Sequence, residues 1–308
     1  MYPRITVVTV NYNLAPFLEE AMRSVLDQEY PNLEYIVVDG GSTDGSQEII
    51  QKYEDRLAWW VSEPDEGQYD ALQKGFARAT GEILCWLNSD DLFHRRSLFT
   101  VAEIFGQYPE VEWLMGFPTE YAPDGSCVHR ITLPWARWSR RRYLTYDFQF
   151  IQQESTFWRR SLWEKAGGKL DTSLQLAGDM ELWARFFRSA QLYTTLTLLG
   201  GFRYRGGDQR SRTQMRAYLD ECRTVIQRER ARLSRGRRIG LTLLRPLAFP
   251  FGLLFFLDVP GLRSVYARWY RLPPVLRYDF DQGKYVKSAR QVKHPPLYLR
   301  GRQVARKG

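Results

Sequence analysis

Short apolar runs alternate with amphipathic segments through the first hundred residues, and this alternation restricts the fold more than any other feature. β-Branched and aromatic residues dominate the runs, which predicts buried strands, whereas the segments between them carry apolar residues at helical spacing. The predicted strands are residues 5–10, 35–38, 58–61 and 83–87, and the predicted helices begin at Pro16 and Tyr69. Such alternation predicts a mostly parallel sheet with right-handed crossovers. We therefore expect an α/β domain of the nucleotide-binding type.

Two adjacent carboxylates, Asp90 and Asp91, directly follow the predicted strand 83–87. Open α/β sheets bind ligands at the carboxyl ends of their strands. Carboxylates are hard oxygen donors that suit a Mg²⁺ or Mn²⁺ ion with open positions for substrate phosphates. A helix N-cap is the alternative for one aspartate, but it leaves the other without a role.

A second polar turn, residues 39–46, follows the strand 35–38. The Asp39 carboxylate can accept a hydrogen bond from the imide N–H of uracil or thymine, and the alternative is that it only begins an Asx-turn. Ser46 is predicted to cap the next helix. The sequence has no G-x-x-x-x-G-K-[ST] motif, and no G-x-G-x-x-G follows the first strand. A bound nucleotide would therefore be held by side chains and a metal ion.

Cysteine and histidine usage excludes several other kinds of site. The three cysteines are widely spaced and odd in number, which fits a reducing compartment and argues against a disulfide framework or a zinc site. The three histidines are also dispersed, so we expect no histidine-based triad. No charged and then apolar leader precedes the first strand, so we expect no signal peptide.

Charge divides the chain into two parts. Residues 209–308 contain 23 Lys and Arg against 6 Asp and Glu, whereas residues 1–208 contain 21 against 29. A basic segment of this kind favours an anionic partner. We therefore predict a first domain, 1–208, and a basic C-terminal extension, 209–308.

The extension begins with a predicted Arg-rich helix, 209–234, and continues into an apolar stretch, 239–257. A membrane-spanning helix needs about 20 apolar residues, but Arg245, Pro246 and Pro250 interrupt this stretch. We expect it to lie in one leaflet, with arginines reaching anionic headgroups. The alternatives are a helical hairpin buried against the first domain and a nucleic-acid-binding tail, although no nucleic-acid-binding motif accompanies the charge.

Four ordered motifs resemble the family 2 glycosyltransferases, which have the GT-A fold. They are Thr6-Val-Val-Thr-Val-Asn-Tyr-Asn13, Val38-Asp-Gly-Gly-Ser-Thr-Asp-Gly45, Ser62-Glu-Pro-Asp-Glu-Gly-Gln-Tyr-Asp-Ala-Leu-Gln-Lys-Gly75 and Trp86-Leu-Asn-Ser-Asp-Asp91. The third motif is similar to that of a subgroup found in bacterial O-antigen and capsule gene clusters. The resemblance covers residues 1–205 and implies a nucleotide-diphosphate sugar as donor and a Mn²⁺ or Mg²⁺ ion.

The resemblance also implies roles for individual residues on the donor side. The residues implied to bind the nucleotide sugar are Thr9, Asn11, Asp39, Glu63, Asp65, Asp70, Lys74 and Asp90. Thr9 and Asp39 would contact the base. The family often has Asp where this chain has Asn88, so one charged ligand is lost. Asp91 is therefore expected to hold the metal with support from Asp90. The alternative for Lys74 is a solvated helix face.

Asp179 is the predicted catalytic base. Inverting sugar transfer needs one carboxylate to take the proton of the acceptor hydroxyl, and a carboxylate that opens a helix after Gly178, beside an apolar face, can do so. The resemblance implies the same role for this Asp, although it could also serve as an N-cap, and Glu181 is the reserve base. The acceptor site is expected to include Gln153, Glu154, Glu181 and Trp183. Arginines and tryptophans alternate irregularly at 135–142. This pattern predicts exposed tryptophans on a surface that contacts sugar or membrane.

These observations together predict an inverting, metal-dependent glycosyltransferase peripheral to the inner face of the cytoplasmic membrane. It would transfer a sugar from a UDP- or dTDP-sugar to a hydroxyl of a lipid-linked saccharide in surface polysaccharide synthesis. One alternative is a membrane-bound protein that binds a sugar nucleotide or glycan without catalysis, which the Asn88 departure favours. A second is a nucleotidyltransferase, for which residues 11–13 lack the Gly-rich, Lys/Arg-bearing loop. No nucleic-acid partner is expected.

Overall fold

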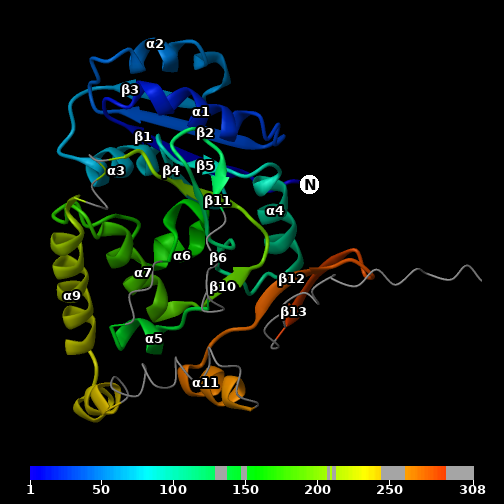
Figure 1. Cartoon of the computed structure of the whole chain (residues 1–308), viewed down its shortest axis with the longest axis vertical. Coiled ribbons are helices and arrows are strands. Elements are labelled where there is room, and N and C mark those ends of the chain that lie inside the picture. Colours follow the sequence, from blue (N-terminus) through cyan, green and yellow to red (C-terminus); the bar gives the residue numbers. More distant parts are fainter. Residues whose placement is uncertain (129–136, 147–150, 207–208, 210–212, 244–260, 289–308) are drawn as a thin grey trace, which may run out of the picture.

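The computed structural model describes the whole chain except residues 129–136, 147–150, 207–208, 210–212, 244–260 and 289–308 (Figure 1). The strands are β1 Ile5–Asn11, β2 Leu33–Asp39, β3 Trp59–Ser62, β4 Ile83–Asn88, β5 Leu92–Phe93, β6 Trp113–Met115, β7 Thr119–Tyr121, β8 Cys127–Val128, β9 Thr156–Arg159, β10 Leu192–Thr195, β11 Gly200–Arg203, β12 Val275–Asp279 and β13 Lys284–Ser288. The helices are α1 Ala15–Leu26, α2 Ser46–Gln51, α3 Gln68–Arg78, α4 Ser97–Gln107, α5 Arg140–Leu144, α6 Arg160–Lys165, α7 Gly178–Ser189, α9 Met215–Ala231 and α11 Leu262–Tyr270.

A nine-stranded sheet, in the order β13-β12-β10-β6-β9-β4-β1-β2-β3, forms the centre of the molecule. Strands β3, β2, β1 and β4 are mutually parallel, whereas β9 runs antiparallel to both β4 and β6. The four strands predicted from apolar runs are confirmed, and so is the mostly parallel α/β sheet. Strands β1 and β2 read as near-continuous apolar runs because helices cover both faces of this part of the sheet.

Aromatic residues fill the core between the sheet and α7. Trp86 on β4 stacks on Trp183 of α7 with ring centroids 5.8 Å apart and an interplanar angle of 8°. Trp113 and Trp158 pack against the same Trp183 ring at 5.4 and 5.7 Å. Aromatic contacts of this kind add about 0.5–1.5 kcal/mol per pair beyond the area that they bury. They fix α7, whose first turn carries Asp179, against the strand that leads to Asp90.

A second sheet, in the order β5-β11-β7-β8, lies beside the first. Residues 122–126 form the turn between β7 and β8, with a hydrogen bond from the Ala122 N–H to the Ser126 carbonyl and Gly125 at φ +81°. Strand β11 pairs with β5, directly after Asp91. This pairing brings the residues at the end of β11 next to the two aspartates.

Part of the predicted C-terminal extension is built into the same body as the first 208 residues. Helix α9 lies along α7 (Figure 1) and buries Cys222, Val225 and Ile226. The hairpin of β12 and β13 extends the main sheet beyond β10. The apolar stretch 239–257 is described only as far as residue 243. No helix in the described part of the chain is long and apolar enough to cross a membrane.

Two local predictions are wrong. Ser46 does not cap α2; the Asp44 carboxylate accepts the Ser46 N–H at 3.1 Å and its hydroxyl at 2.6 Å, because Asp44 lies before the helix and Ser46 within its first turn. Trp138 is not exposed; it is 3% accessible and the Arg142 guanidinium lies 4.2 Å from its ring. Trp135 lies outside the described residues.

Candidate active site

The polar residues that end β1, β2 and β4 lie side by side at the carboxyl edge of the parallel sheet. Asn11 is in register with Asp39, and Asn88 with Val10, because the three strands are parallel neighbours. This is the edge at which such sheets bind ligands. Strand order alone therefore brings together the motifs predicted to form the donor site.

Asp39 is completely buried, and its carboxylate accepts five hydrogen bonds. The donors are Asn11 Nδ2 at 2.7 Å, Gly41 N at 3.2 Å, Ser42 N at 2.8 Å, Ser42 Oγ at 2.6 Å and Ser62 Oγ at 2.6 Å. A carboxylate offers about four lone-pair sites, so these donors use its whole capacity. Asp39 thus forms the Asx-turn. Its carboxylate could accept a hydrogen bond from a nucleobase only if one of these five hydrogen-bond donors moved away.

Thr9 and Asn11 also face the interior. The Thr9 hydroxyl accepts a hydrogen bond from Tyr35 at 3.0 Å and has no accessible surface, so it offers nothing to a ligand. Asn11 is 4% accessible and donates to Asp39. The next side chain, Tyr12, is 60% exposed, and its ring lies 3.2 Å from where a Cβ on Gly40 would be. Gly40 therefore lets Tyr12 lie against the turn.

Glu63, Asp65, Asp70 and Lys74 lie together in the loop between β3 and α3 and the first turns of α3. The Lys74 ammonium lies 3.0 Å from Glu63 and 3.4 Å from Asp70, and it also donates to the Pro64 carbonyl at 3.2 Å. Asp65 accepts the Gly67 N–H at 2.8 Å and lies against Gly40 of the Asp39 turn. Lys74 is therefore tied into the loop and is not merely a solvated lysine.

Asn88 connects residues predicted for the donor side with one predicted for the acceptor side through its amide. Its oxygen accepts from Gln68 at 2.8 Å, and its nitrogen donates to Asp91 at 3.0 Å and to Gln153 at 3.3 Å. Gln153 in turn donates to the Trp86 carbonyl at 2.7 Å. With Asn88 bonded to three side chains, its neutral amide acts as a structural link between β4 and residue 153.

Asp90 and Asp91 differ in what they face. The Asp90 carboxylate lies 2.6 Å from Nε of Arg205, and its side chain keeps 12% of its surface accessible. Asp91 is 1% accessible, and its two oxygens accept from Arg203 N and Asn88 Nδ2, both at 3.0 Å. Asp91 is therefore a buried anchor, and Asp90 is the carboxylate that a ligand can reach.

Burial raises the pKa of both aspartates. For Asp90 the Arg205 and Arg203 guanidiniums oppose this effect, whereas for Asp91 the neighbouring Asp90 and Glu154 carboxyls increase it. Three buried carboxyls thus repel one another here, and a bound cation would relieve that repulsion. No group of three or more His, Cys, Asp or Glu residues in the described ranges forms a ready metal cluster. Mg²⁺ needs only one or two protein carboxylates when phosphates supply the other oxygens, so Asp90 fits such an ion.

Glu154 is the third carboxyl and lies between the two ends of the site. It is 5% accessible, and its Oε1 has no hydrogen-bond partner among the described residues. Burial raises its pKa to about 8, and both Asp90 and Asp179 contribute to the increase. The donor end and the predicted base therefore share one site.

Asp179 lies in the first turn of α7 and is partly buried. Its Oδ1 accepts the Met180 N–H at 2.7 Å, while Ala177, not Asp179, is the N-cap residue. Burial raises the pKa of Asp179 to about 7, and the Glu221 carboxylate adds to this increase. A carboxyl with this pKa can both hold and release a proton near neutrality, as a general base must.

Glu221, on α9, holds the segment that leads into α7. Its carboxylate accepts the backbone N–H groups of Gln175, Leu176 and Ala177 at 3.3, 3.0 and 2.8 Å. On the other side, the Tyr69 hydroxyl donates to the Leu176 carbonyl at 2.9 Å. The segment that leads to the predicted base, Asp179, is thus held from both α3 and α9.

The remaining predicted acceptor residues have structural contacts. Glu181 forms an ion pair with Arg185 at 2.7 Å, so it is not placed to replace Asp179. Trp183 is fully buried in the aromatic core, where its ring packs against Trp86, Trp113 and Trp158, and it cannot touch an acceptor. Sequence reasoning missed Arg203, Arg205, Glu221 and Tyr69. The arginines at positions 203 and 205, at the end of β11, were a readable signal, whereas nothing local marks Glu221.

Comparison with known sequences agrees with this geometry. Residues 6–164 match the profile described as Glycosyl transferase family 2. An uncharacterized glycosyltransferase of Mycobacterium tuberculosis is 31% identical over 250 residues, which is 80% of this chain and 92% of the relative. A putative teichuronic acid biosynthesis glycosyltransferase of Bacillus subtilis is 37% identical over 99 residues, 31% of this chain and 39% of that protein. The chain belongs to glycosyltransferase family 2.

Solved structures confirm the GT-A fold. Staphylococcus aureus TarS 1–349 in complex with UDP-GlcNAc superposes with a TM-score of 0.63 at 18% identity, covering 85% of this chain and 77% of that one. The mannosyltransferase PcManGT of Pyrobaculum calidifontis, in complex with GDP-Man and Mn²⁺, gives a TM-score of 0.57 at 22% identity, covering 87% and 76%. Membership of glycosyltransferase family 2 makes the protein a glycosyltransferase.

Proposed function

We propose that this protein is an inverting, metal-dependent glycosyltransferase that uses a UDP- or dTDP-sugar and extends a lipid-linked saccharide in surface polysaccharide synthesis. The observation that carries the proposal is the position of Glu154, whose pKa is raised by Asp90 from the donor side and by Asp179 from the base side. One site would then contain a phosphate end and a proton-accepting end, which transfer requires and simple sugar-nucleotide binding does not.

The nucleobase of the donor nucleotide would lie at the turn after β2. Tyr12 offers an exposed ring beside Gly40, while Asp39, held by its five donors, keeps the turn in shape. Asp65, against Gly40, and the Lys74 cluster would line the same side. The mannosyltransferase neighbour was solved with GDP-Man and TarS with UDP-GlcNAc, and calorimetric binding of UDP, dTDP and GDP identifies the nucleobase that this site takes.

The diphosphate would lie against Asp90 and Arg205, which follows β11. A divalent ion held by Asp90 and the phosphates would offset the charge that develops on the leaving diphosphate. Arg205, whose Nε lies 2.6 Å from Asp90, would add positive charge at the same place. Asp91 would keep Asp90 in position through its bonds to the Arg203 backbone and to Asn88.

Asp179 would receive the proton of the acceptor hydroxyl. As the acceptor oxygen forms its bond to the anomeric carbon, the bond from that carbon to the diphosphate oxygen breaks, and the nucleoside diphosphate leaves with the electron pair. Attack from the face opposite the leaving group inverts the anomeric configuration. Glu221 would position Asp179 by holding residues 175–177.

The relatives support a cell-surface polysaccharide as the product, since one is named for teichuronic acid biosynthesis. The basic C-terminal segment supports an acceptor carried at the inner face of the cytoplasmic membrane. The test is transfer of radiolabelled sugar from UDP- and dTDP-sugars to lipid extracts by the wild type and by Asp179→Asn. We expect labelled lipid-linked product that Asp179→Asn does not form. Equal product from the variant would refute the mechanism.

A further inference from the structure

Two short helices at one end of the molecule expose apolar side chains toward solvent. One is the helical segment 235–243 and the other is α11. Ile239 and Leu243 are 52% and 67% exposed, and Val265 and Trp269 are 49% and 38% exposed. Within each pair the residues are four apart, so they lie on the same face of their helix. Exposed apolar groups that cluster in this way mark an interaction surface.

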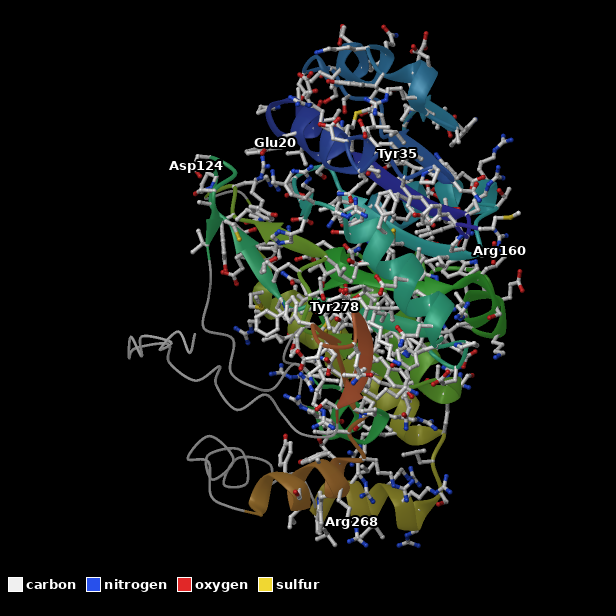
Figure 2. All side chains as sticks on the ribbon, turned by 90° about the vertical axis from the view of Figure 1, so that its right-hand side faces the viewer. Glu20, Tyr35, Asp124, Arg160, Arg268 and Tyr278 are labelled. Carbon is white, nitrogen blue, oxygen red and sulfur yellow. The ribbon has the colours of Figure 1, made fainter. Side chains whose placement is uncertain are left out.

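The two helices are neighbours. A cavity of about 670 Å³ lies between them and the C-terminal end of α7, and Leu233, Leu241, Phe187, Arg237, Trp269 and Arg271 line it. Figure 1 shows α11 at the lower end of the molecule, and Figure 2 shows Arg268 at the same end. Asp179 is at the opposite end of α7, about 15 Å away along the helix at 1.5 Å per residue.

Arginines surround these apolar groups. Arg235, Arg237, Arg238, Arg268 and Arg271 are exposed, and none of them forms an ion pair with a carboxylate of the described chain. From residue 232 to 278 the sequence contains nine arginines and a single carboxylate, Asp258. An apolar face with a surplus of unpaired positive charge is complementary to a surface that is apolar beneath an anionic layer.

We infer that the segment 235–243 and α11 form a docking face for an anionic lipid bilayer. Ile239, Leu243, Val265 and Trp269 enter the boundary between headgroups and acyl chains, while the arginines bind the phosphates above it. This inference rests on the proposed function and adds to it how the enzyme meets its acceptor. Docking by this face would hold the active site at a fixed distance from the membrane that carries the lipid-linked acceptor. The catalytic base then meets sugars held away from the membrane surface.

The test is co-sedimentation of the full-length protein with vesicles of phosphatidylcholine alone or mixed with phosphatidylglycerol. We expect binding to the anionic vesicles that weakens as salt is added. The double variant Ile239→Ser, Leu243→Ser should bind them at least about tenfold more weakly. Phe280→Ser, which removes an apolar side chain that is 90% exposed in the turn between β12 and β13, is the control and should bind as the wild type does.

A charge pair of variants gives an independent measurement. Arg235→Gln with Arg238→Gln should weaken binding about tenfold or more at low salt, whereas Arg95→Gln with Arg216→Gln, which removes the same charge elsewhere, should have little effect. Equal loss in both pairs would mean only non-specific attraction and would overturn the docking face. So would wild-type binding by the serine double variant, or a dimer in ultracentrifugation that the serine variant abolishes.

UDP affinity is measured on every variant to separate this inference from the proposed function. Variants of the docking face should keep the wild-type affinity, because none of them touches the site. Failure of the wild type to bind any nucleotide would count against the proposed function, whereas vesicle binding unaffected by the face variants would count against the docking face alone.

Discussion

The Glu221 carboxylate accepts the backbone N–H of Ala177 at 2.8 Å, and Ala177 is the residue that precedes the helix carrying Asp179. A glutamate in the C-terminal third of the chain thus fixes the position of the predicted base. It also places a negative charge near Asp179, which contributes to the raised pKa of that carboxyl. Positioning and pKa are therefore linked through a single side chain.

Replacing Glu221 by Gln should lower kcat about tenfold to hundredfold, since small displacements of a catalytic group have effects of this size. Nucleotide affinity should stay unchanged. Loss of the charge also lowers the pKa of Asp179, so the acidic limb of the pH–rate profile should move to lower pH. The matched control is Asp220→Asn on the exposed side of α9, where Asp220 pairs with Arg223 at 2.6 Å. A profile that does not move in Glu221→Gln would contradict the link.

The activity of the wild type should rise with pH through about 7, the pKa of Asp179, because a general base works only when deprotonated. The groups whose charges interact with Asp179 are Glu221, Glu154, Tyr69, Tyr143, Tyr218 and Cys222. Asp179→Asn should lose about 10²–10⁴-fold in kcat. Glu181→Gln, which breaks only the pair with Arg185, should keep most activity. An acid limb near pH 4 would contradict this assignment.

The same raised pKa affects stability. The folded state holds the Asp179 proton more tightly than the unfolded chain does, so its contribution to stability is lost as pH rises from about 4 to 7. Asp179→Asn removes this effect and should therefore raise the melting temperature at pH 8 relative to the wild type, with a smaller gain at pH 4. Scanning calorimetry at both pH values checks this. A variant less stable than wild type at pH 8 would show that the carboxylate stabilises the fold.

Gly178 has to be glycine because of Tyr69. A Cβ at this position would lie 2.7 Å from the Tyr69 ring, so Gly178→Ala should destabilise the protein by about 1–3 kcal/mol and displace Asp179. At Gly106, within α4, a Cβ would have no neighbouring atom within 4 Å, and Gly106→Ala should stabilise the protein by about 0.5–1 kcal/mol. Denaturant unfolding measures both. Equal effects at the two glycines would refute the close approach of Tyr69 as the cause.

Replacing the two aspartates after β4 should affect different properties, nucleotide binding for Asp90 and stability for Asp91. Asp90→Asn removes the carboxylate that a ligand can reach, so metal-dependent nucleotide binding should be lost while the fold survives. Asp91→Asn leaves a buried amide beside the Asn88 amide and the Arg203 N–H, and should mainly lower the free energy of unfolding. Thermal unfolding with and without UDP and Mn²⁺ distinguishes the two. Normal stability with abolished binding in Asp91→Asn would restore Asp91 as the metal ligand.

The sequence predicted the strands and the edge at which the motifs meet, because buried parallel strands have strong local patterns. It could not predict what each side chain touches. Asp39 ends β2 and Thr9 lies within β1, as predicted. Their hydrogen-bond partners, Ser62 and Tyr35, come from the neighbouring strands β3 and β2. Asp90 and Asp91 are adjacent in sequence, and only the pairing of β11 with β5 decides which one meets Arg205. Glu221 could not be predicted for the same reason, since only the packing of α9 on α7 brings it close to Asp179, the predicted base.

The division of the site into a donor end at Asp90 and a base at Asp179 is best tested by calorimetric binding of UDP, dTDP and GDP, with and without Mn²⁺. The samples are the wild type, Asp90→Asn and Asp179→Asn, and transfer is assayed on each of them. We predict metal-dependent binding of UDP or dTDP that Asp90→Asn loses and Asp179→Asn retains, with transfer lost in both. Binding that needs no metal and survives Asp90→Asn, or transfer that survives Asp179→Asn, would contradict the assignment of the two ends of the site.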